Sequence, residues 1–169
     1  MGIPVRGQLT AVRPATAEDV DLLVTWHADP DVSRYWDDET FTDDEMRARL
    51  ERPDVDAFVV EADGKPIGYL QAWWEEEDDS KRGGIDMFLI PSARGRGLGP
   101  DAARALVRHL REDRGWAQVT VDPYSWNDAA IRAWRKAGFV EVEERPADDG
   151  HSASWLLMVW RPLRQSPGT

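Results

Sequence analysis

The sequence predicts an α/β fold in which a mixed central sheet carries helices on both of its faces. Segments with strand-like and helix-like apolar spacing alternate along the chain, and a nearly continuous apolar strand over 85–90 lies near its middle. A glycine-rich loop follows that strand and leads into a segment over 102–110 with helical apolar spacing. Because 169 residues suffice for one substantial core, we expect a single domain over 1–169, with an ordered part over about 8–161 and a loose C-terminal tail.

The N-terminal half contains start and stop signals for helices and one hairpin signal. Thr16 followed by Asp19 has the spacing of a capping box, and Asp29-Pro30 ends the helix that follows. Asp63-Gly64 between two apolar runs is typical of a tight β-hairpin turn. The expected elements are a strand over 8–13, a helix from 16 to 28, helical stretches over 31–36 and 42–51, and strands over 56–62 and 65–74.

The C-terminal half alternates again between strand and helix. The central strand over 85–90 precedes the 102–110 helix, and Gly138 is the natural stop of a second helix. The remaining expected elements are a strand over 116–121, that second helix over 127–137, and closing strands over 139–144 and 153–160.

The composition excludes several classes of function. The chain has no cysteine, which rules out disulfides, thiolate catalysis and cysteine-based metal sites, and we expect His27, His109 and His151 to be surface or packing residues. A net charge of −11 opposes nucleic-acid binding, and it favours either a cationic small-molecule partner or simply solubility. No apolar run approaches a membrane span or a secretory signal, so we expect a metal-free cytoplasmic protein without membrane contact.

The loop after the central strand has the chemistry of an anion site. Gly95, Gly97 and Gly99 allow the backbone to bend sharply and to approach a ligand, and the start of the next helix presents free N–H groups. Arg94 and Arg96 add positive charge. These features suit a pyrophosphate group, although a plain strand–turn–helix junction would contain the same glycines.

Two acidic residues stand where an amine has to be held and deprotonated. Asp86 interrupts the apolar central strand and, by the period of two, shares a face with Phe88. Asp122 ends the neighbouring strand. Together they suit the binding of one ammonium group and the acceptance of its proton, directly or through water. The alternatives are a buried salt bridge for Asp86 and a turn-forming role before Pro123 for Asp122.

The pattern as a whole resembles a known family. Arg94-x-x-Gly97-x-Gly99 is similar to the acyl-CoA pyrophosphate loop of the GCN5-related N-acetyltransferase superfamily, and 127–139 resembles that family's later helix with its closing Gly-Phe. The resemblance implies acetyl-CoA as the donor and a fold in which the fourth and fifth strands, here 85–90 and 116–121, splay apart. It implies that the backbone of 88–90 holds the thioester carbonyl. The cofactor-binding set is then Phe88, Leu89, Ile90, Arg94, Gly95, Arg96, Gly97, Leu98, Gly99, Asn127 and Trp134.

Further motifs narrow the resemblance to the aminoglycoside 6′-N-acetyltransferases. The motifs are Gly84-Ile85-Asp86-x-Phe88-Leu89, Asp122-Pro123-x-x-x-Asn127, Gly68-Tyr69-x-Gln71 and the Trp-Trp-Glu-Glu-Glu run over 73–77, and the similarity covers most of 10–160. This resemblance makes a cationic aminosugar the expected acceptor, Asp86 and Asp122 its amine contacts, and Asp86 the base. The five consecutive acids over 75–79 fit either a solvated loop or an acidic lip of an amine site beside Trp73 and Trp74. The expected acceptor-binding set therefore also contains Trp36, Trp73, Trp74 and Glu75.

One residue departs from the family pattern. Trp134 occupies the position where the family usually has a tyrosine, which is often assigned as the acid that protonates departing CoA. An indole N–H donates a hydrogen bond but is no useful acid. The thiolate therefore leaves unprotonated or takes a proton from water, or Tyr124 substitutes, or turnover is slow. We expect Trp134 to support the sulfur only by packing or hydrogen bonding.

Two other functions are compatible with these residues. A related acyltransferase acting on the side-chain amine of a lysine-derived siderophore precursor shares much of the pattern. A non-catalytic module that binds acyl-CoA or sequesters a cationic drug is the alternative outside the enzymes. For the assembly, we expect a monomer or a weak homodimer.

Overall fold

The computed structural model describes residues 4–74 and 82–162. The strands are β1 (Val5–Arg6), β2 (Ala11–Pro14), β3 (Val55–Ala62), β4 (Lys65–Trp74), β5 (Arg82–Leu89), β6 (Gln118–Val121), β7 (Phe139–Arg145) and β8 (Trp155–Trp160). The helices are α1 (Val20–Ala28), α2 (Pro30–Ser33), α3 (Asp43–Leu50), α4 (Leu98–Arg108) and α5 (Asp128–Ala137). Two 3-10 turns, η1 (Ala17–Asp19) and η2 (Pro91–Ala93), and a π-helical segment, η3 (His109–Asp113), complete them.

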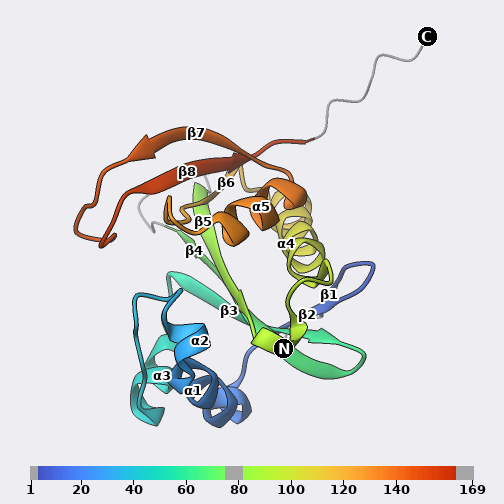
Figure 1. The fold of residues 1–169 in the computed structure, drawn as a ribbon. Helices are drawn as coiled ribbons and strands as arrows, with labels where there is room; N and C mark the ends of the chain where they lie inside the picture. Colours follow the sequence, from blue (N-terminus) through green and yellow to red (C-terminus); the bar gives the residue numbers. More distant parts are fainter. Residues whose placement is uncertain (1–3, 75–81, 163–169) are drawn as a thin grey trace.

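All eight strands form one sheet in the order β1-β2-β3-β4-β5-β6-β8-β7. Every neighbouring pair is antiparallel except β5 and β6, which are parallel. Helices α1, α2 and α3 cover one face of the sheet, and α4 and α5 cover the other (Figure 1). The predicted mixed sheet with helices on both faces is confirmed.

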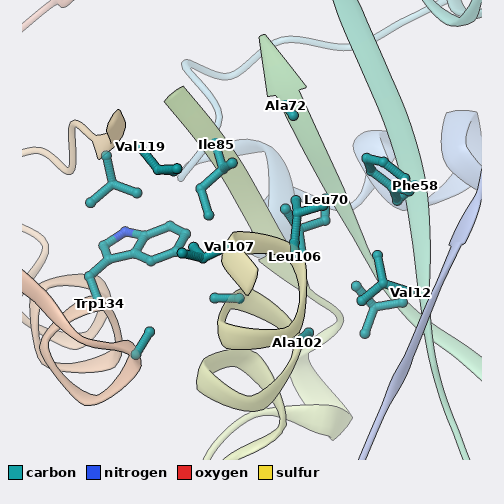
Figure 2. Packing of buried hydrophobic residues seen from close by; sticks show 14 of the residues in the cluster. Val12, Phe58, Leu70, Ala72, Ile85, Ala102, Leu106, Val107, Val119 and Trp134 are labelled. Carbon is teal, nitrogen blue, oxygen red and sulfur yellow. The ribbon is translucent and has the colours of Figure 1, made fainter. Parts of the chain in front are cut away.

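The alternation of side chains along the central strands divides the interior into two clusters. Leu70 and Ile85 belong to the cluster under α4 and α5, whereas Tyr69 and Phe88 belong to the cluster under α1 to α3. Figure 2 shows part of the first cluster, with side chains of α4 and α5 packed against those of the sheet. The two faces of β5 therefore meet two different environments.

Several local signals have the predicted effect. The Asp19 carboxylate accepts the Thr16 N–H at 2.8 Å, as the capping-box spacing predicts. Asp63 and Gly64 have φ angles of 51° and 75°, so both adopt the left-handed conformation of a primed hairpin turn between β3 and β4. These features depend on a few adjacent residues, which is why the sequence alone predicts them.

Several element boundaries differ from the predicted ones. Strand β2 covers Ala11–Pro14 and not 8–13, and β6 covers Gln118–Val121 and not 116–121. Strand β1 was not predicted, and it pairs with β2. Helix α2 is shorter than the predicted stretch over 31–36. Helix α4 begins at Leu98, earlier than predicted, because Gly97 has a φ of 77° and the chain turns directly from the loop into the helix.

The gap between β5 and β6 begins after a short paired segment. Residues 82–84 of β5 pair with 118–120 of β6, and β5 then continues to Leu89 beside β4 alone. On the other edge of β6, Thr120 and Val121 pair with β8. The predicted splay between these two strands is confirmed, and it opens peptide groups of β5 to a ligand.

Candidate active site

The gap opens into a cavity of about 430 Å³ between β5, the glycine loop, the start of α4 and one side of α5. Ile90 and Arg96 are the two members of the predicted cofactor-binding set that do not line it. The walls also contain residues that the sequence analysis did not single out. The lining residues from both groups are Phe88, Leu89, Arg94, Gly95, Gly97, Leu98, Gly99, Asn127, Trp134, Tyr35, Met87, Pro100, Ala129, Ala130, Arg132, Ala133 and Lys136.

The hydrogen bonds between β4 and β5 decide which peptide groups of β5 face the gap. The Ile90 N–H donates to the Ile67 carbonyl at 2.9 Å, so Ile90 is bonded toward β4. Residues along an antiparallel strand bond alternately to its two sides, so Phe88 also bonds toward β4 while Met87 and Leu89 turn their peptide groups toward the gap. Within the predicted carbonyl-binding stretch over 88–90, Leu89 turns its amide toward the gap, and Met87, just before the stretch, does the same.

The glycine loop has the backbone geometry of an anion site. Gly95 and Gly97 have φ angles of 78° and 77°, and a Cβ atom added at either would meet nothing within 4 Å. These glycines therefore serve the backbone conformation rather than packing. Gly97 caps α4, so the first amides of the helix, at Leu98 and Gly99, have no acceptor within the helix. A diphosphate group fits these amides, and Pro100 falls in the first turn where its missing N–H costs no helical hydrogen bond.

Of the two arginines predicted to add positive charge, Arg94 lines the cavity and Arg96 does not. The Arg94 guanidinium donates to the Leu89 carbonyl at 3.0 Å and to the Asp31 carbonyl at 2.8 Å, so it joins β5 to α2. Arg132 and Lys136 of α5 also line the cavity, and neither was predicted. Their i, i+4 spacing places both on one side of a helix, and this was the signal available in the sequence.

Asp101 does not oppose an anion in the cavity, because its carboxylate faces the N-terminus of the chain. It accepts the N–H groups of Gln8, Leu9 and Thr10 at 2.9–3.0 Å and the Thr10 hydroxyl at 2.7 Å. Burial alone would raise the pKa of Asp101, but these hydrogen bonds outweigh burial and lower it. Asp101 thus anchors the turn between β1 and β2 on α4.

Asn127 has a structural role as well as a place in the cavity. Its Oδ1 accepts the Ala130 N–H at 3.2 Å and so caps α5. The capping bond uses the carbonyl end of the side chain, which leaves the amide N–H groups of Asn127 for a ligand.

Trp134 packs mainly in the core. Its side chain is 7% exposed and its ring meets Phe139 edge-on at 5.3 Å. The hydroxyl of Tyr124, the predicted substitute acid, bonds to Asp37, and Tyr124 is not among the lining residues. Tyr35 is the phenol that lines the cavity in the described part of the chain.

The two acids selected from the sequence lie together at the gap. Asp86 is partly buried on β5, and burial together with repulsion from Asp122 raises the pKa of Asp86 to about 7. A hydrogen bond from Gln71 and the charge of Arg49 oppose this shift. The two carboxyl groups are close enough to share a hydrogen bond. A carboxyl group that titrates near neutrality can both accept and release a proton.

A chain of polar side chains passes through this pair. The Gln71 Nε2 donates to Asp86 Oδ2 at 2.9 Å, and Arg49 Nη2 donates to Gln71 Oε1 at 2.9 Å. On the other side, Asp122 Oδ2 lies 2.6 Å from His151 Nε2. Sequence reasoning missed Arg49 and the role of His151, because each lies far along the chain from its partner.

The aromatic residues predicted to bind the acceptor fall on both faces of the sheet. Trp73 follows Gln71 by two residues and therefore shares the face of Asp86, with its indole against Gly84. Trp74 points the other way and meets Trp116 edge-on at 6.1 Å in the α4-side core. The structure corrects the acceptor-binding prediction for Trp74, because adjacent residues of a strand face opposite sides.

Trp36 lies on the same face as Asp86. It packs edge-on against Phe88 at 5.6 Å and Tyr69 at 5.9 Å, within the cluster under α1 to α3. Glu75 and the rest of the acidic run over 75–79 lie outside the described residues.

A larger hollow of about 920 Å³ lies between β1, β3 and η3, away from the gap. Two of its positively charged or basic side chains already bind carboxylates, since Arg114 pairs with Asp56 and His109 Nδ1 lies 2.8 Å from Asp113 Oδ2. Neither the paired acids nor the free strand amides border this hollow, so the gap is the candidate active site.

Comparison with known proteins assigns this arrangement to a family. The family model described as "Acetyltransferase (GNAT) domain" matches residues 15–146, which include the sheet from β3 to β6, the glycine loop and both acids. The chain belongs to the GNAT acetyltransferase family. The fold, the strand gap and the helix start beside it are therefore those of an acetyltransferase of this family.

Characterised relatives of this acetyltransferase modify aminoglycosides. It is 32% identical over 156 residues to "Aminoglycoside N(6')-acetyltransferase type 1" of Klebsiella pneumoniae, covering 82% of this chain and 78% of the relative. The structure of AAC(6')-Ib with paromomycin and acetyl-CoA superposes with a TM-score of 0.78 at 29% identity, covering 90% and 93% of the two chains. The structure of AAC(6')-Ib with coenzyme A and kanamycin superposes with a TM-score of 0.75 at 30% identity, covering 89% of this chain and 93% of that chain.

Metal and membrane features are not seen in the described part of this acetyltransferase. Within residues 4–74 and 82–162, no three His, Cys, Asp or Glu side chains form a group that could hold a metal ion. Over the same residues, no helix has the length and apolar character needed to cross a membrane.

Proposed function

We propose that this chain transfers the acetyl group of acetyl-CoA to the 6′-amino group of an aminoglycoside, and so confers resistance to the drug. The observation that carries the proposal is the Asp86–Asp122 pair beside a gap that ends at the free amides of a helix start. The relatives, one solved with acetyl-CoA and one with coenzyme A and kanamycin, support the same donor and acceptor. The net charge of −11 is compatible with a cationic aminosugar.

The residues of the cavity fit the donor along its length. Acetyl-CoA supplies, when bound, a thioester carbonyl that an amine can attack. The amides of Leu98 and Gly99 would bind its diphosphate, with Arg132 and Lys136 adding positive charge. The Asn127 amide faces the same cavity and would donate to the pantetheine arm.

One of the free peptide N–H groups of β5, at Met87 or at Leu89, would stabilise the negative charge that develops on the carbonyl oxygen. The amides of Met87 and Leu89 face the gap and are held by the rigid ladder to β4. Preorganised donors of this kind are worth most where water is excluded, and removing one typically costs about a hundredfold or more in rate.

The acids act on the acceptor amine. An alkyl ammonium group is positively charged at neutral pH and cannot attack until it loses a proton. Asp122 would hold the ammonium group, and ionised Asp86, with its pKa raised to about 7, would accept the proton directly or through water. Trp73 and Trp36 provide aromatic surface on the same face as Asp86.

The test is a panel of amines incubated with the purified chain and acetyl-CoA, with thiol release as the readout. Kanamycin is compared with an aminoglycoside that carries a hydroxyl group at the 6′ position, and with a lysine-derived siderophore precursor and spermidine. NMR then locates the new amide. We expect turnover with kanamycin, an amide at the 6′ nitrogen, and no turnover with the 6′-hydroxyl drug.

Each of the other outcomes contradicts the proposal and indicates a different function. Turnover restricted to the lysine-derived amine indicates the siderophore-type acyltransferase. Tight binding of coenzyme A by calorimetry without turnover of any amine indicates a non-catalytic acyl-CoA module. Equal turnover of the 6′-hydroxyl drug places the reaction at another position of the sugar.

A further inference from the structure

The Oδ2 atom of Asp122 contacts a histidine side chain from the loop between β7 and β8. His151 Nε2 lies 2.6 Å from Asp122 Oδ2, and His151 Nδ1 lies 2.8 Å from Asp148 Oδ1. Both ring nitrogens thus face carboxylate oxygens. A neutral imidazole has one N–H and one lone pair, so one of these contacts would be repulsive, whereas an imidazolium donates to both. The geometry therefore favours a positively charged His151.

The ring is fixed by its neighbours as well as by these two bonds. It stacks on Trp155 with centroids 4.2 Å apart and planes 13° from parallel, and Tyr124 meets its edge at 6.0 Å. The Trp155 Nε1 donates to Asp148 Oδ2 at 3.1 Å, so the loop carboxylate is itself held in place. The His151 side chain is 16% exposed. A rotation of the imidazole would break several of these contacts at once.

The surroundings of the ring are mainly acidic. Partial burial alone would lower the pKa of His151, but the hydrogen bonds to Asp122 and Asp148 outweigh burial and raise it. The charged and titratable groups around the ring are Asp122 and Tyr124 after β6, Asp148 in the β7–β8 loop, Arg145 of β7 over Trp155, Asp37 bonded to Tyr124 and, beyond Asp122, Asp86 of β5.

When two adjacent carboxyl groups have the same environment, either one can hold the proton while the other is the anion. A difference in environment assigns the proton to one of them. Here the environments do differ, because Asp122 contacts the imidazole of His151 and Asp86 contacts the neutral amide of Gln71. We propose that His151 is a positioning residue that holds the Asp122 side chain in place as the anchor of the amine and leaves Asp86 as the group that accepts the proton. Its catalytic meaning rests on the proposed acetyl transfer, but the charge arrangement belongs to the folded protein without substrate.

The decisive variant is His151→Phe, which keeps a ring beside Trp155 and removes both N–H donors. We expect kcat/KM for the acceptor to fall about 10- to 100-fold, the size of a lost hydrogen bond to a charged group. We also expect the pH midpoint of kcat/KM to rise by about one unit, because a cation beside the acid pair is removed. A merely structural role for His151 lowers the rate without moving this midpoint.

Two further variants separate the charge of His151 from its shape. His151→Gln keeps one hydrogen-bond donor without a charge. Relative to His151→Phe, it is expected to bring the acceptor KM part of the way back to that of the unmodified protein and to leave the pH midpoint shifted. Asp148→Asn leaves the imidazole ring in place and is expected to lower the pKa of His151, which NMR of the imidazole measures. This variant provides the test if His151→Phe does not fold. His109→Phe is the matched control, since His109 makes a similar bond to Asp113 at η3 and should change neither rate nor midpoint.

A measurement without substrate distinguishes failure of this inference from failure of the proposed function. The titration of the Asp86 carboxyl is followed by carbon NMR in the unmodified protein and in the His151 variants, with Asp86→Asn used for assignment. We expect the Asp86 midpoint to rise in both His151→Phe and His151→Gln. An unchanged midpoint in both variants overturns the inference. If the unmodified protein acetylates no amine, the proposed function fails while this titration still decides the role of His151.

Discussion

The two faces of the sheet serve the two substrates by different means. On the α4 and α5 side, the core is largely aliphatic, with side chains such as Leu106 and Val107 fully buried, and the donor cavity relies on backbone amides and glycines. On the α1 to α3 side, aromatic rings lie beside a chain of partly buried polar side chains that runs from Arg49 through Gln71 to Asp86. Side-chain substitutions should therefore act on acceptor chemistry through the second face and on stability through the first.

His27 illustrates the character of the acceptor face. It is fully buried among the edges of Trp36, Phe41 and Phe88, and its ring nitrogens have no hydrogen-bond partner among the described residues. Burial, together with the charge of Arg49, lowers the pKa of His27 to about 4. His27 thus stays neutral, in contrast to the charged environment of His151 on the same molecule.

The largest expected effect comes from Asp86→Asn on the acceptor face. The substitution removes the proposed base, so kcat/KM for the amine should fall by about a thousandfold. The affinity for coenzyme A, measured by calorimetry, should not change, because the donor lies against backbone amides. Glu144→Gln, an exposed acid of β7, is the control. A rate within tenfold of the unmodified enzyme would remove Asp86 from the mechanism.

Leu106→Ala tests the opposite face and should act on stability alone. Leu106 is fully buried in the α4-side cluster, so the lost burial and the cavity left behind should lower the free energy of unfolding by about 2–5 kcal/mol. Urea unfolding measures this, with Leu9→Ala at a site 57% exposed as the control. A changed acceptor KM in the folded variant would contradict the separation of the two faces.

His27→Leu tests the pH dependence of the acceptor face. Because the folded pKa of about 4 lies below the ordinary value of 6.5, stability from neutral His27 is complete above pH 6.5 and is lost as the pH falls toward 4. The full loss is up to about 3 kcal/mol. Relative to the unmodified protein, the leucine variant should therefore gain free energy of unfolding as the pH falls from 6.5 to 4, measured by urea titration at several pH values. A difference that stays constant with pH would show that the pKa of His27 is the same in the folded and the unfolded protein.

Asp86 should have the opposite pH dependence in the same window. Its folded pKa of about 7 lies above the ordinary 3.8, so its contribution to stability is present at low pH and is lost as the pH rises toward 7. Between pH 4 and 6.5, the contributions of His27 and Asp86 to the pH dependence of the free energy of unfolding have opposite signs and partly cancel. The free energy of unfolding of Asp86→Asn should therefore fall more steeply toward low pH over this range than that of the unmodified protein.

The smallest expected effect distinguishes the two adjacent tryptophans. Trp73→Leu removes aromatic surface on the face of Asp86 and should raise the acceptor KM about threefold, the size of an exposed cation–π contact. Trp74→Leu should leave the acceptor KM unchanged and lower the melting temperature, because Trp74 packs in the α4-side core. Equal effects of both variants on KM would contradict the assignment of faces.

Local features of the fold were predictable because each depends on a few adjacent residues. The Thr16–Asp19 cap, the Asp63-Gly64 turn and the Gly138 helix stop, with a φ of 108°, follow from the preferences of those residues. The glycine loop and the placement of Asp86 on the face of Phe88 follow from motif and period in the same way. These signals also carried the resemblance to the acetyltransferases.

What the sequence by itself determined about this protein is the succession of elements, the loop for an anion and the two acids. Only the tertiary structure decided that Arg94 binds backbone carbonyls, that the amides of Met87 and Leu89 face the gap, and that His151 holds Asp122. Arg49 and Gln71 are 22 residues apart, and Asp122 and His151 are 29 apart. Contacts at such separations depend on how strands and loops pack in space, and no spacing along the chain specifies them.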